Sequence, residues 1–309
     1  MATNQTNEEV PGSSARERFG PEIALWAVVL IWSSTFIAMK DAFTFIDPLQ
    51  YTLFRFIWIN VLAIAVLLFQ HRRDSSILLT IRRKDLPRFL LASIPGYTLY
   101  QICSVIGLDH SSVFTLSLLV AMVPLFTMLM LAGMGEQIPR FGWIGLGIAV
   151  IGVIVFLSNK RSGDDSVEGA LFSLGAAIAF AFYGVVNRPL VKAYPPATYT
   201  AYSLVFGTIP LIFIAGPGLV DQEWNGIPLR FWLGTIYVVI FPVYIAYQLW
   251  NYGIQKRGAA AASSYGLIVP ILSGILSAIV FSESFGLLKI IGATLVMAGV
   301  LVLRLKPAS

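Results

Sequence analysis

Long apolar runs separated by short polar connections fill the chain from about residue 22 to residue 304. A helix needs about 20 apolar residues to cross the hydrocarbon core of a bilayer. Ten runs come close to that length, at residues 22–41, 49–70, 87–107, 111–133, 141–158, 168–187, 197–216, 230–251, 258–281 and 286–304. Pro or Gly interrupts several of them, which membrane helices tolerate because neighbouring helices can satisfy the freed backbone groups. The pattern predicts an all-α integral membrane protein with ten transmembrane helices.

The composition agrees with this pattern. Of the 309 residues, 57% are hydrophobic and 12% are charged, whereas a soluble domain carries about 25% charged residues. Cys103 is the only cysteine, so no intrachain disulfide can form, and neither His71 nor His110 stands at metal-ligand spacing. The formal net charge of +5 follows from its distribution around the apolar runs and does not indicate a nucleic-acid partner. We expect no metal and no cofactor, and a chain surrounded by the lipid bilayer.

The basic residues predict the orientation of the runs. Placing both ends of the chain on one side puts fifteen of the 21 Lys and Arg residues there, and the positive-inside rule makes that side cytoplasmic. Five lie in connections on the other side: Lys40, Lys160, Arg161, Arg230 and Lys289. Residues 1–20 are polar and lack the apolar region of a signal peptide, so we expect a disordered cytoplasmic tail.

An eight-residue stretch occurs twice in the chain. Residues 94–101 and 241–248 carry Pro, Tyr, Tyr and Gln at the same places, 147 positions apart. The repeat continues at offsets of 146 to 148, and its matching pairs are Lys40/Arg188, Pro48/Pro196, Pro124/Pro270, Glu136/Glu283, Gly145/Gly292 and Gly152/Gly299. We therefore divide the chain into a first repeat at 21–160 and a second at 161–305, with five runs each. Because five is odd, the second repeat crosses in the opposite direction, and inverted repeats are typical of alternating-access transporters.

The chain resembles the drug/metabolite transporter superfamily, in particular its ten-helix EamA branch. The residues that carry the resemblance are Trp32-Ser33-Ser34-Thr35-Phe36, Arg55, Pro124 and Gly135-Glu136, and then Pro270, Ser282-Glu283 and the glycines between 292 and 299. The resemblance implies two inverted five-helix repeats in a bacterial inner-membrane protein that moves small metabolites, often by exporting amino acids. It does not identify the substrate.

Two polar stripes form the main candidate site. Positions i, i+3, i+4 and i+7 of a helix share one face, and each copy of the repeated stretch meets this spacing. The members are Tyr97, Tyr100, Gln101 and Ser104 in the third run, and Tyr244, Tyr247, Gln248 and Asn251 in the eighth. We predict that the stripes face each other across a central cavity and bind an amphipathic solute. The alternative is that they join helices across a buried interface.

Two further residues extend this candidate site. Trp32 stands about ten residues into its run, too deep for an interface anchor, so it either lines the cavity or packs against a neighbour. Arg55 is the only clearly intramembrane charge, which costs about 3 kcal/mol at the bilayer centre. It either extends outward to the interface or, as the family resemblance favours, anchors a substrate carboxylate or pairs with Asp109.

Proline and glutamate recur at matching places in the fourth and ninth runs. Pro124 and Pro270 each remove a backbone donor, so they are candidate hinges, with a static kink as the alternative. Glu136 and Glu283 follow these runs, and we expect them to cap the next helix rather than couple protons. A proton relay needs ionisable groups at the midplane, and the sequence places no Asp, Glu or His convincingly there.

The sequence therefore predicts a transporter of amino acids or similar amphipathic solutes that works by facilitated diffusion or exchange. A carrier of organic cations or drugs is the alternative within transport, because aromatic faces attract cations, although no buried carboxylate supports it. A sugar-phosphate exchanger would need more basic residues in the cavity. An intramembrane enzyme is the alternative of another class, but Ser111 and Ser112 beside His110 form no catalytic constellation. The oligomeric state stays open, a monomer included.

Overall fold

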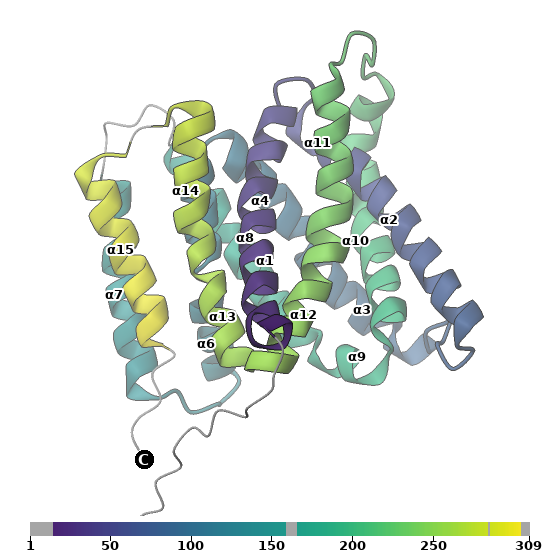
Figure 1. Ribbon diagram of the computed structural model, residues 1–309, viewed down its shortest axis with the longest axis horizontal. Helices are drawn as coiled ribbons and strands as arrows, with labels where there is room; N and C mark the ends of the chain where they lie inside the picture. The colour runs from purple at the N-terminus through teal and green to yellow at the C-terminus, as the bar shows by residue number, and fades with distance from the viewer. Residues whose placement is uncertain (1–14, 159–165, 284, 304–309) are drawn as a thin grey trace, which may run out of the picture.

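The computed structural model describes residues 15–158, 166–283 and 285–303 (Figure 1). Over these ranges the regular elements are all helical. In chain order they are α1 (Ala15–Ala42), α2 (Pro48–Arg73), η1 (Arg83–Asp85), α3 (Leu86–Ser93), η2 (Ile94–Leu99), α4 (Tyr100–Asp109), α5 (Val113–Val120), α6 (Val123–Gly133), α7 (Arg140–Leu157), α8 (Val167–Val186), α9 (Arg188–Ala193), α10 (Pro196–Val220), α11 (Leu229–Ile240), η3 (Phe241–Ile245), α12 (Ala246–Arg257), α13 (Ala259–Gly266), α14 (Ile268–Phe281) and α15 (Leu287–Val302).

These elements make up the ten expected spans. In the described part of the chain, nine helical segments are long and apolar enough to cross a membrane, and the tenth, α15, is a shorter apolar helix of 16 residues. At 1.5 Å per residue, α15 is about 24 Å long, slightly less than the thickness of the hydrocarbon core. One boundary needs correction, because α1 already begins at Ala15, so residues 15–20 are helical instead of belonging to the tail. Residues 1–14 of the expected tail lie outside the described residues.

Four spans are interrupted at repeat-related places. The third span runs from α3 through η2 to α4 and the eighth from α11 through η3 to α12, and the π-helical turns η2 and η3 contain Pro95 and Pro242. The fourth span breaks between α5 and α6 just before Pro124, and the ninth breaks between α13 and α14 just before Pro270. Proline donates no backbone hydrogen bond and its ring disturbs the preceding turn, so each interruption follows from a proline.

The two ends of the described chain lie at the same end of the bundle. α1 begins and α15 ends at the lower end in Figure 1. We call this end the terminal face and the other end the opposite face. Successive spans alternate in direction, so α1 starts from the terminal face and α8, the first span of the second repeat, starts from the opposite face. The second repeat is therefore inverted relative to the first.

The last spans of the two repeats, α7 and α15, pack against each other through glycines. A Cβ at Gly145 would lie 2.5 Å from the carbonyl oxygen of Gly299, and one at Gly152 would lie 2.8 Å from that of Gly292. Gly145 corresponds to Gly292, and Gly152 to Gly299. Exchanging the repeats therefore maps this interface onto itself, as a two-fold relation between inverted repeats requires.

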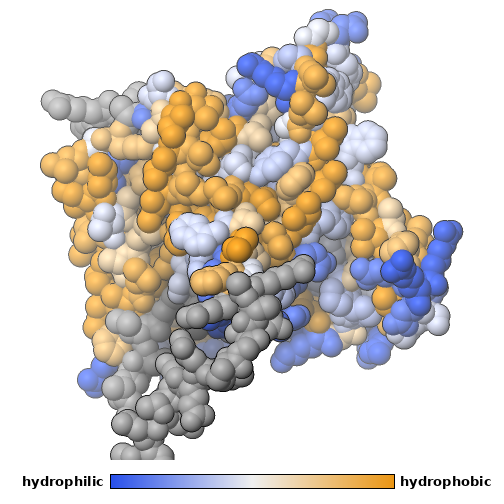
Figure 2. All heavy atoms as spheres, in the orientation of Figure 1, coloured by the Kyte–Doolittle hydropathy of each residue, from blue (hydrophilic) through white to orange (hydrophobic). Residues whose placement is uncertain are grey.

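The surface is consistent with a bilayer around the bundle. Apolar side chains cover the sides of the helices in view, and strongly hydrophilic residues gather near the two ends (Figure 2). Large apolar side chains such as Phe213, Ile236 and Ile279 are more than half exposed. In water such side chains would form an unfavourable surface, whereas against lipid tails they need no cover.

Candidate functional site

The repeated Pro-Tyr-Tyr-Gln stretches form the π-helical turns η2 and η3 and the first residues that follow them. The backbone N–H of Tyr100 donates to the carbonyl of Pro95, and that of Ala246 donates to Phe241, both five residues back. A π-helical turn places one extra residue in the helix and is frequent at functional sites. The duplicated stretch therefore specifies a local backbone geometry in each repeat as well as a row of polar side chains.

Arg55, a residue of α2, is buried and bonds to α4. Its side chain is 5% exposed, and its Nη2 donates a hydrogen bond of 2.5 Å to Oε1 of Gln101. Its Nε is buried without a hydrogen-bond partner. The expected pairing with Asp109 is wrong, because Asp109 is an exposed residue that lies 3.9 Å from the ring of His110. Arg55 does not extend to the interface either, so it reaches its main partner within the bundle.

A chain of hydroxyl groups runs from Tyr97 into the second repeat. The hydroxyl of Tyr97 lies 3.2 Å from that of Tyr183 on α8, and Tyr199 on α10 donates to Tyr183 at 2.6 Å. The side-chain amide of Asn187 donates to Tyr199 at 3.1 Å. Gly96 makes this approach possible, because a Cβ at that position would overlap the Cβ and ring of Tyr183. Tyr183 and Tyr199 belong to neither polar stripe, so the stripe pattern does not predict them.

The stripe on the eighth span is more exposed than its counterpart. Tyr247 is half exposed, and Gln248 and Asn251 are exposed as well. The ring of Trp32 on α1 packs 6.1 Å from that of Tyr247 and 5.2 Å from that of Trp250, so Trp32 joins α1 to this stripe. Tyr244 instead donates its hydroxyl to the carbonyl of Ile59 on α2 at 3.2 Å.

Residues of both stripes pack against one apolar cluster. Tyr97 and Tyr244 both contact this cluster, which includes Ile59 of α2 and Leu204 of α10. Tyr100 also packs its ring 5.1 Å from Phe180. Polar side chains are costly against lipid, so the exposed side of α12 is better explained by an aqueous space than by a lipid contact. The structure thus brings the predicted aromatic residues together, and their contact with a substrate stays a prediction.

Access to this region differs between the two faces. Toward the opposite face, α5 packs against α14, α1 and α15. Toward the terminal face, the repeat-related helix α13 packs against α1, α12 and α14, and in the described part of the chain it makes no comparable packing against α6 or α8. Ser104 is buried, whereas its repeat equivalent Asn251 is exposed. The described helices therefore pack more closely toward the opposite face than toward the terminal face, and we take the terminal face as the open side.

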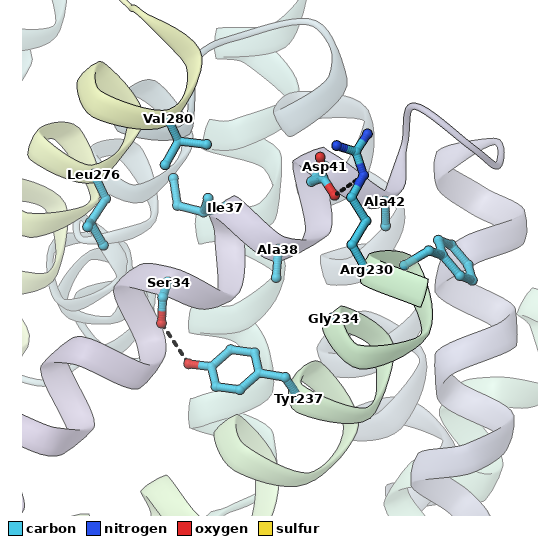
Figure 3. A pocket seen from close by; sticks show the side chains of 11 residues that line it. Ser34, Ile37, Ala38, Asp41, Ala42, Arg230, Gly234, Tyr237, Leu276 and Val280 are labelled. Atoms are coloured by element: carbon cyan, nitrogen blue, oxygen red, sulfur yellow. Dashed lines mark hydrogen bonds and ion pairs between the residues drawn. The ribbon is translucent and has the colours of Figure 1, made fainter. Parts of the chain in front are cut away.

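A separate pocket of about 430 Å³ lies between α1, α11 and α14 (Figure 3). The hydroxyls of Ser34 and Tyr237 are 2.6 Å apart at one end, and Arg230 lies 3.7 Å from Asp41 at the other. Apolar side chains such as Leu276 make up most of the remaining lining. No residue of the two polar stripes lines this pocket, so it is distinct from the region between them.

The predicted hinge residues stand at real interruptions of their spans. Pro124 is the second residue of α6 and Pro270 the third residue of α14. In each span one helix ends and the next begins within the few residues before the proline. At this junction the backbone N–H of Met122 or Leu267 bonds to the carbonyl three residues back. These are places where a small backbone change would redirect half a span, and whether they move stays a prediction.

The expected capping by the two glutamates needs correction. Glu136 does not cap α7, whose N-cap is Pro139 and whose N-terminus has no side-chain cap hydrogen bond, and it lies instead 3.9 Å from Arg188. Glu283 accepts a hydrogen bond from the N–H of Val113, the first residue of α5, and not from the helix that follows it. Both glutamates therefore contact the other repeat, which no local capping pattern indicates.

Two lysines expected in exposed connections are also placed differently. Lys289 is 1% exposed, and its Nζ donates to the hydroxyl of Ser112 at 3.0 Å and lies 5.1 Å from the ring centre of Phe285. Lys40 donates to the carbonyl of Ser111 at 2.9 Å. Both stay near the opposite face, but they hold elements together there instead of extending into solvent. Lys160 and Arg161 lie outside the described residues.

Comparison with known proteins places the chain in a family. The model of the EamA-like transporter family matches residues 21–158 and again residues 167–305, once in each repeat. The chain belongs to this family. It is a membrane transporter and not an enzyme, and its all-α fold consists of ten transmembrane helices in two inverted five-helix repeats.

Relatives of the chain match over nearly its whole length. An uncharacterized transporter of Archaeoglobus fulgidus is 26% identical over 280 residues, which is 90% of this chain and 96% of the relative. A probable terminal-alkyne amino-acid exporter of Streptantibioticus cattleyicolor is 26% identical over 286 residues, 91% of this chain and 93% of the relative. A crystal structure with 21% identity has a TM-score of 0.60 and covers 92% of this chain and 96% of its own, which supports the fold of this EamA-family transporter.

Proposed function

We propose that this transporter exports amino acids or similar amphipathic solutes that carry a carboxylate. The observation that carries the proposal is the buried guanidinium of Arg55, which has one side-chain partner, Gln101, and an Nε without a partner. Among the described residues, no carboxylate lies within ion-pair distance of Arg55. A substrate carboxylate would supply the missing negative charge with the fork geometry that arginine binds well.

The aromatic residues suit the rest of such a solute. Tyr97, Tyr100 and Tyr247 each combine an aromatic ring with a hydroxyl group, and Trp32 packs beside Tyr247. Rings of this kind bind an apolar side chain and offer a hydroxyl to an amino or amide group. The name of the Streptantibioticus relative, a probable amino-acid exporter, supports the same substrate class.

The charge distribution supports the direction. The sequence assigns fifteen of the 21 basic residues to the side on which both chain ends are expected, and the positive-inside rule makes that side cytoplasmic in a bacterial inner membrane. In that orientation the open side in this structure faces the cytoplasm, from which an exported solute would enter. Both stripes and both repeats belong to one chain, so a monomer would suffice for residues 21–160 and 161–305 to act as two moving units.

The ionisable residues favour facilitated diffusion or exchange over proton coupling. A proton relay needs a carboxylate or histidine at depth, and the buried carboxylate of Glu283 lies near the opposite face, paired with Lys40. An organic cation carrier is the second candidate, supported by the aromatic rings. The positive charge of Arg55 in the same region counts against it.

Counterflow in proteoliposomes tests the proposal. Liposomes would be loaded with unlabelled amino acids, and uptake of each labelled amino acid followed without a pH gradient. We expect uptake that falls at least tenfold in Arg55→Gln and in Gln248→Ala but stays unchanged in Arg230→Gln, which removes an exposed arginine. The parent amino acid should compete, whereas its amide, which lacks the carboxylate, should not. Competition by both equally would refute the carboxylate site, and uptake of no amino acid would refute the substrate class.

A further inference from the structure

A buried ion pair closes the opposite face between the two repeats. Nζ of Lys40, at the end of α1, lies 3.2 Å from Oε1 of Glu283, which follows α14. The side chain of Glu283 is 2% exposed and that of Lys40 is 22% exposed. Lys40 also donates to the carbonyl of Ser111, and Glu283 accepts from the N–H of Val113. The pair thus ties the ends of α1 and α14 to the α4–α5 connection.

A second ion pair occupies the repeat-related position at the terminal face. Arg188, at the start of α9, lies 3.9 Å from Glu136, which follows α6, and both side chains are more than half exposed. Arg188 is the repeat equivalent of Lys40, and Glu136 is the equivalent of Glu283. Each pair joins one residue of the first repeat to one of the second. The two pairs are therefore related by the same exchange that relates the repeats, yet one is tight and buried and the other loose and exposed.

The backbone supports this equivalence. Gly135 has φ +90° and Ser282 has φ +55°, so both glutamates follow a residue in the left-handed region. A left-handed residue is usually glycine or asparagine, because a side chain at positive φ is strained. That Ser282 adopts this conformation indicates that the position of Glu283 requires the same turn in both repeats.

The two glutamates differ in how closely the neighbouring helices pack around them. Beside Glu283, α5 packs against α14, and a Cβ at Gly274 would lie 2.9 Å from the ring of Phe114. Beside Glu136 there is a pocket of about 410 Å³, lined by residues that include Pro124, Met128 and Leu303. The helix that corresponds to α5 is α13, whose N-cap Gly258 provides no side-chain bond. The pocket is the space that α13 could enter.

We propose that Lys40–Glu283 and Arg188–Glu136 are the two gates of the transport cycle and that they tighten alternately. In the state of this structure, Lys40–Glu283 holds the opposite face closed. In the alternative state, α13 packs against α6, Glu136 accepts from the first N–H groups of α13 as Glu283 now does from α5, and Arg188 tightens onto Glu136. Lys40 and Glu283 separate at the same time.

The closed gate is built so that it can open. Oε2 of Glu283 is buried without a hydrogen-bond partner, so its carboxylate is only partly satisfied. A buried pair with unsatisfied atoms recovers less of its desolvation cost than a complete one. Opening exposes both groups to water and forms the second pair, so the free energies of the two states can stay close. This inference does not depend on which solute is carried.

Cysteine reactivity without substrate tests the gates. In a Cys103→Ser background, Asn251→Cys reports opening to the terminal face and its repeat equivalent Ser104→Cys reports opening to the opposite face. The ratio of their labelling rates by a membrane-impermeant maleimide, applied to each side of oriented vesicles, measures the equilibrium. We expect Glu283→Gln and Lys40→Met to shift the ratio at least tenfold toward Ser104→Cys. Glu136→Gln should shift it at least tenfold toward Asn251→Cys, and the double variant Glu136→Gln/Glu283→Gln should return it toward the parent value.

The decisive variant is Glu136→Gln, because its ion pair is loose and exposed in this structure. A merely surface pair of this kind contributes little, so an unchanged ratio in Glu136→Gln would overturn the proposal. A shift in the same direction for Glu136→Gln and Glu283→Gln would also overturn it. Asp41→Asn is the matched control, since it removes an acid from the exposed pair with Arg230 at the opposite face and should leave the ratio unchanged.

Discussion

Inside the bundle, tyrosine hydroxyls bond to groups on other spans, whereas many serine and threonine hydroxyls bond to the backbone of their own helix. Tyr183 is the central example, because its hydroxyl lies between those of Tyr97 and Tyr199, which come from the third and seventh spans. A hydroxyl in this position satisfies two partners that would otherwise face an apolar region. The chain of hydroxyls therefore fixes how α8 sits against η2 and α10.

Replacing Tyr183 with Phe should lower the free energy of unfolding by about 1–2 kcal/mol, because two hydroxyls lose their common partner while the ring is kept. Reversible unfolding in detergent measures the change. Tyr202→Phe is the control, since its hydroxyl makes one bond, to the carbonyl of Leu79 at the terminal end of α10, and should cost less. Equal losses of unfolding free energy in the two variants would show that the hydroxyl chain stabilises the protein no more than a single hydrogen bond does.

For single residues, the sequence predicts which side chains belong to the site better than it predicts their hydrogen-bond partners. The duplicated stretch singles out Tyr97, Tyr100 and Gln101, because polar residues recurring in apolar runs are unlikely by chance to keep their spacing. It cannot show that Gln101 pairs with Arg55, 46 positions away. Lys289 gives no signal at all, since its repeat position holds Gly142 and its burial depends on aromatic rings from three elements.

Among the elements, α7 and α15 form the interface with the closest backbone contact. Their glycines leave no room for side chains, and van der Waals contact of this kind is a main source of stability between membrane helices. Four other spans are divided into shorter helices at prolines, which are Pro95, Pro124, Pro242 and Pro270. The sequence predicts both features from repeated Gly and Pro, but proline alone does not distinguish the π-helical turns at η2 and η3 from ordinary kinks.

Gly152→Ala should destabilise the transporter by about 1–3 kcal/mol, because the added methyl would lie 2.6 Å from the backbone nitrogen of Val296 and α15 would have to move away. Thermal unfolding in detergent would show the loss. Gly147→Ala on the same helix is the matched control, since a Cβ there meets nothing within 4 Å, and it should be neutral or slightly stabilising. A neutral Gly152→Ala would mean that the interface is looser than its geometry indicates.

For the whole molecule, the ten spans and the inverted repeat follow from the sequence, because hydrophobic length and a 147-residue offset are encoded along the chain. The sequence does not predict which of the two conformations the molecule adopts. Inverted repeats make two conformations nearly equivalent, so small differences between the repeats decide which is lower in free energy. Here Lys289 holds the α4–α5 connection at the opposite face through Ser112, and Gly142 cannot do the same at the terminal face. This difference favours the state that is open to the terminal face.

Distances between spin labels should change in opposite directions at the two faces if the repeats exchange roles. Met134 and Lys256 are exposed at the terminal face, and Asp109 and Val280 are exposed at the opposite face, where Val280 lies next to the repeat equivalent of Met134. Without substrate we expect one main distance for each pair. A transported solute should add a shorter Met134–Lys256 distance and a longer Asp109–Val280 distance in the same fraction of molecules, because closing one face requires opening the other. Pulsed electron paramagnetic resonance measures both distributions, and equal shortening of the two pairs would show that the solute compacts the protein without alternating access.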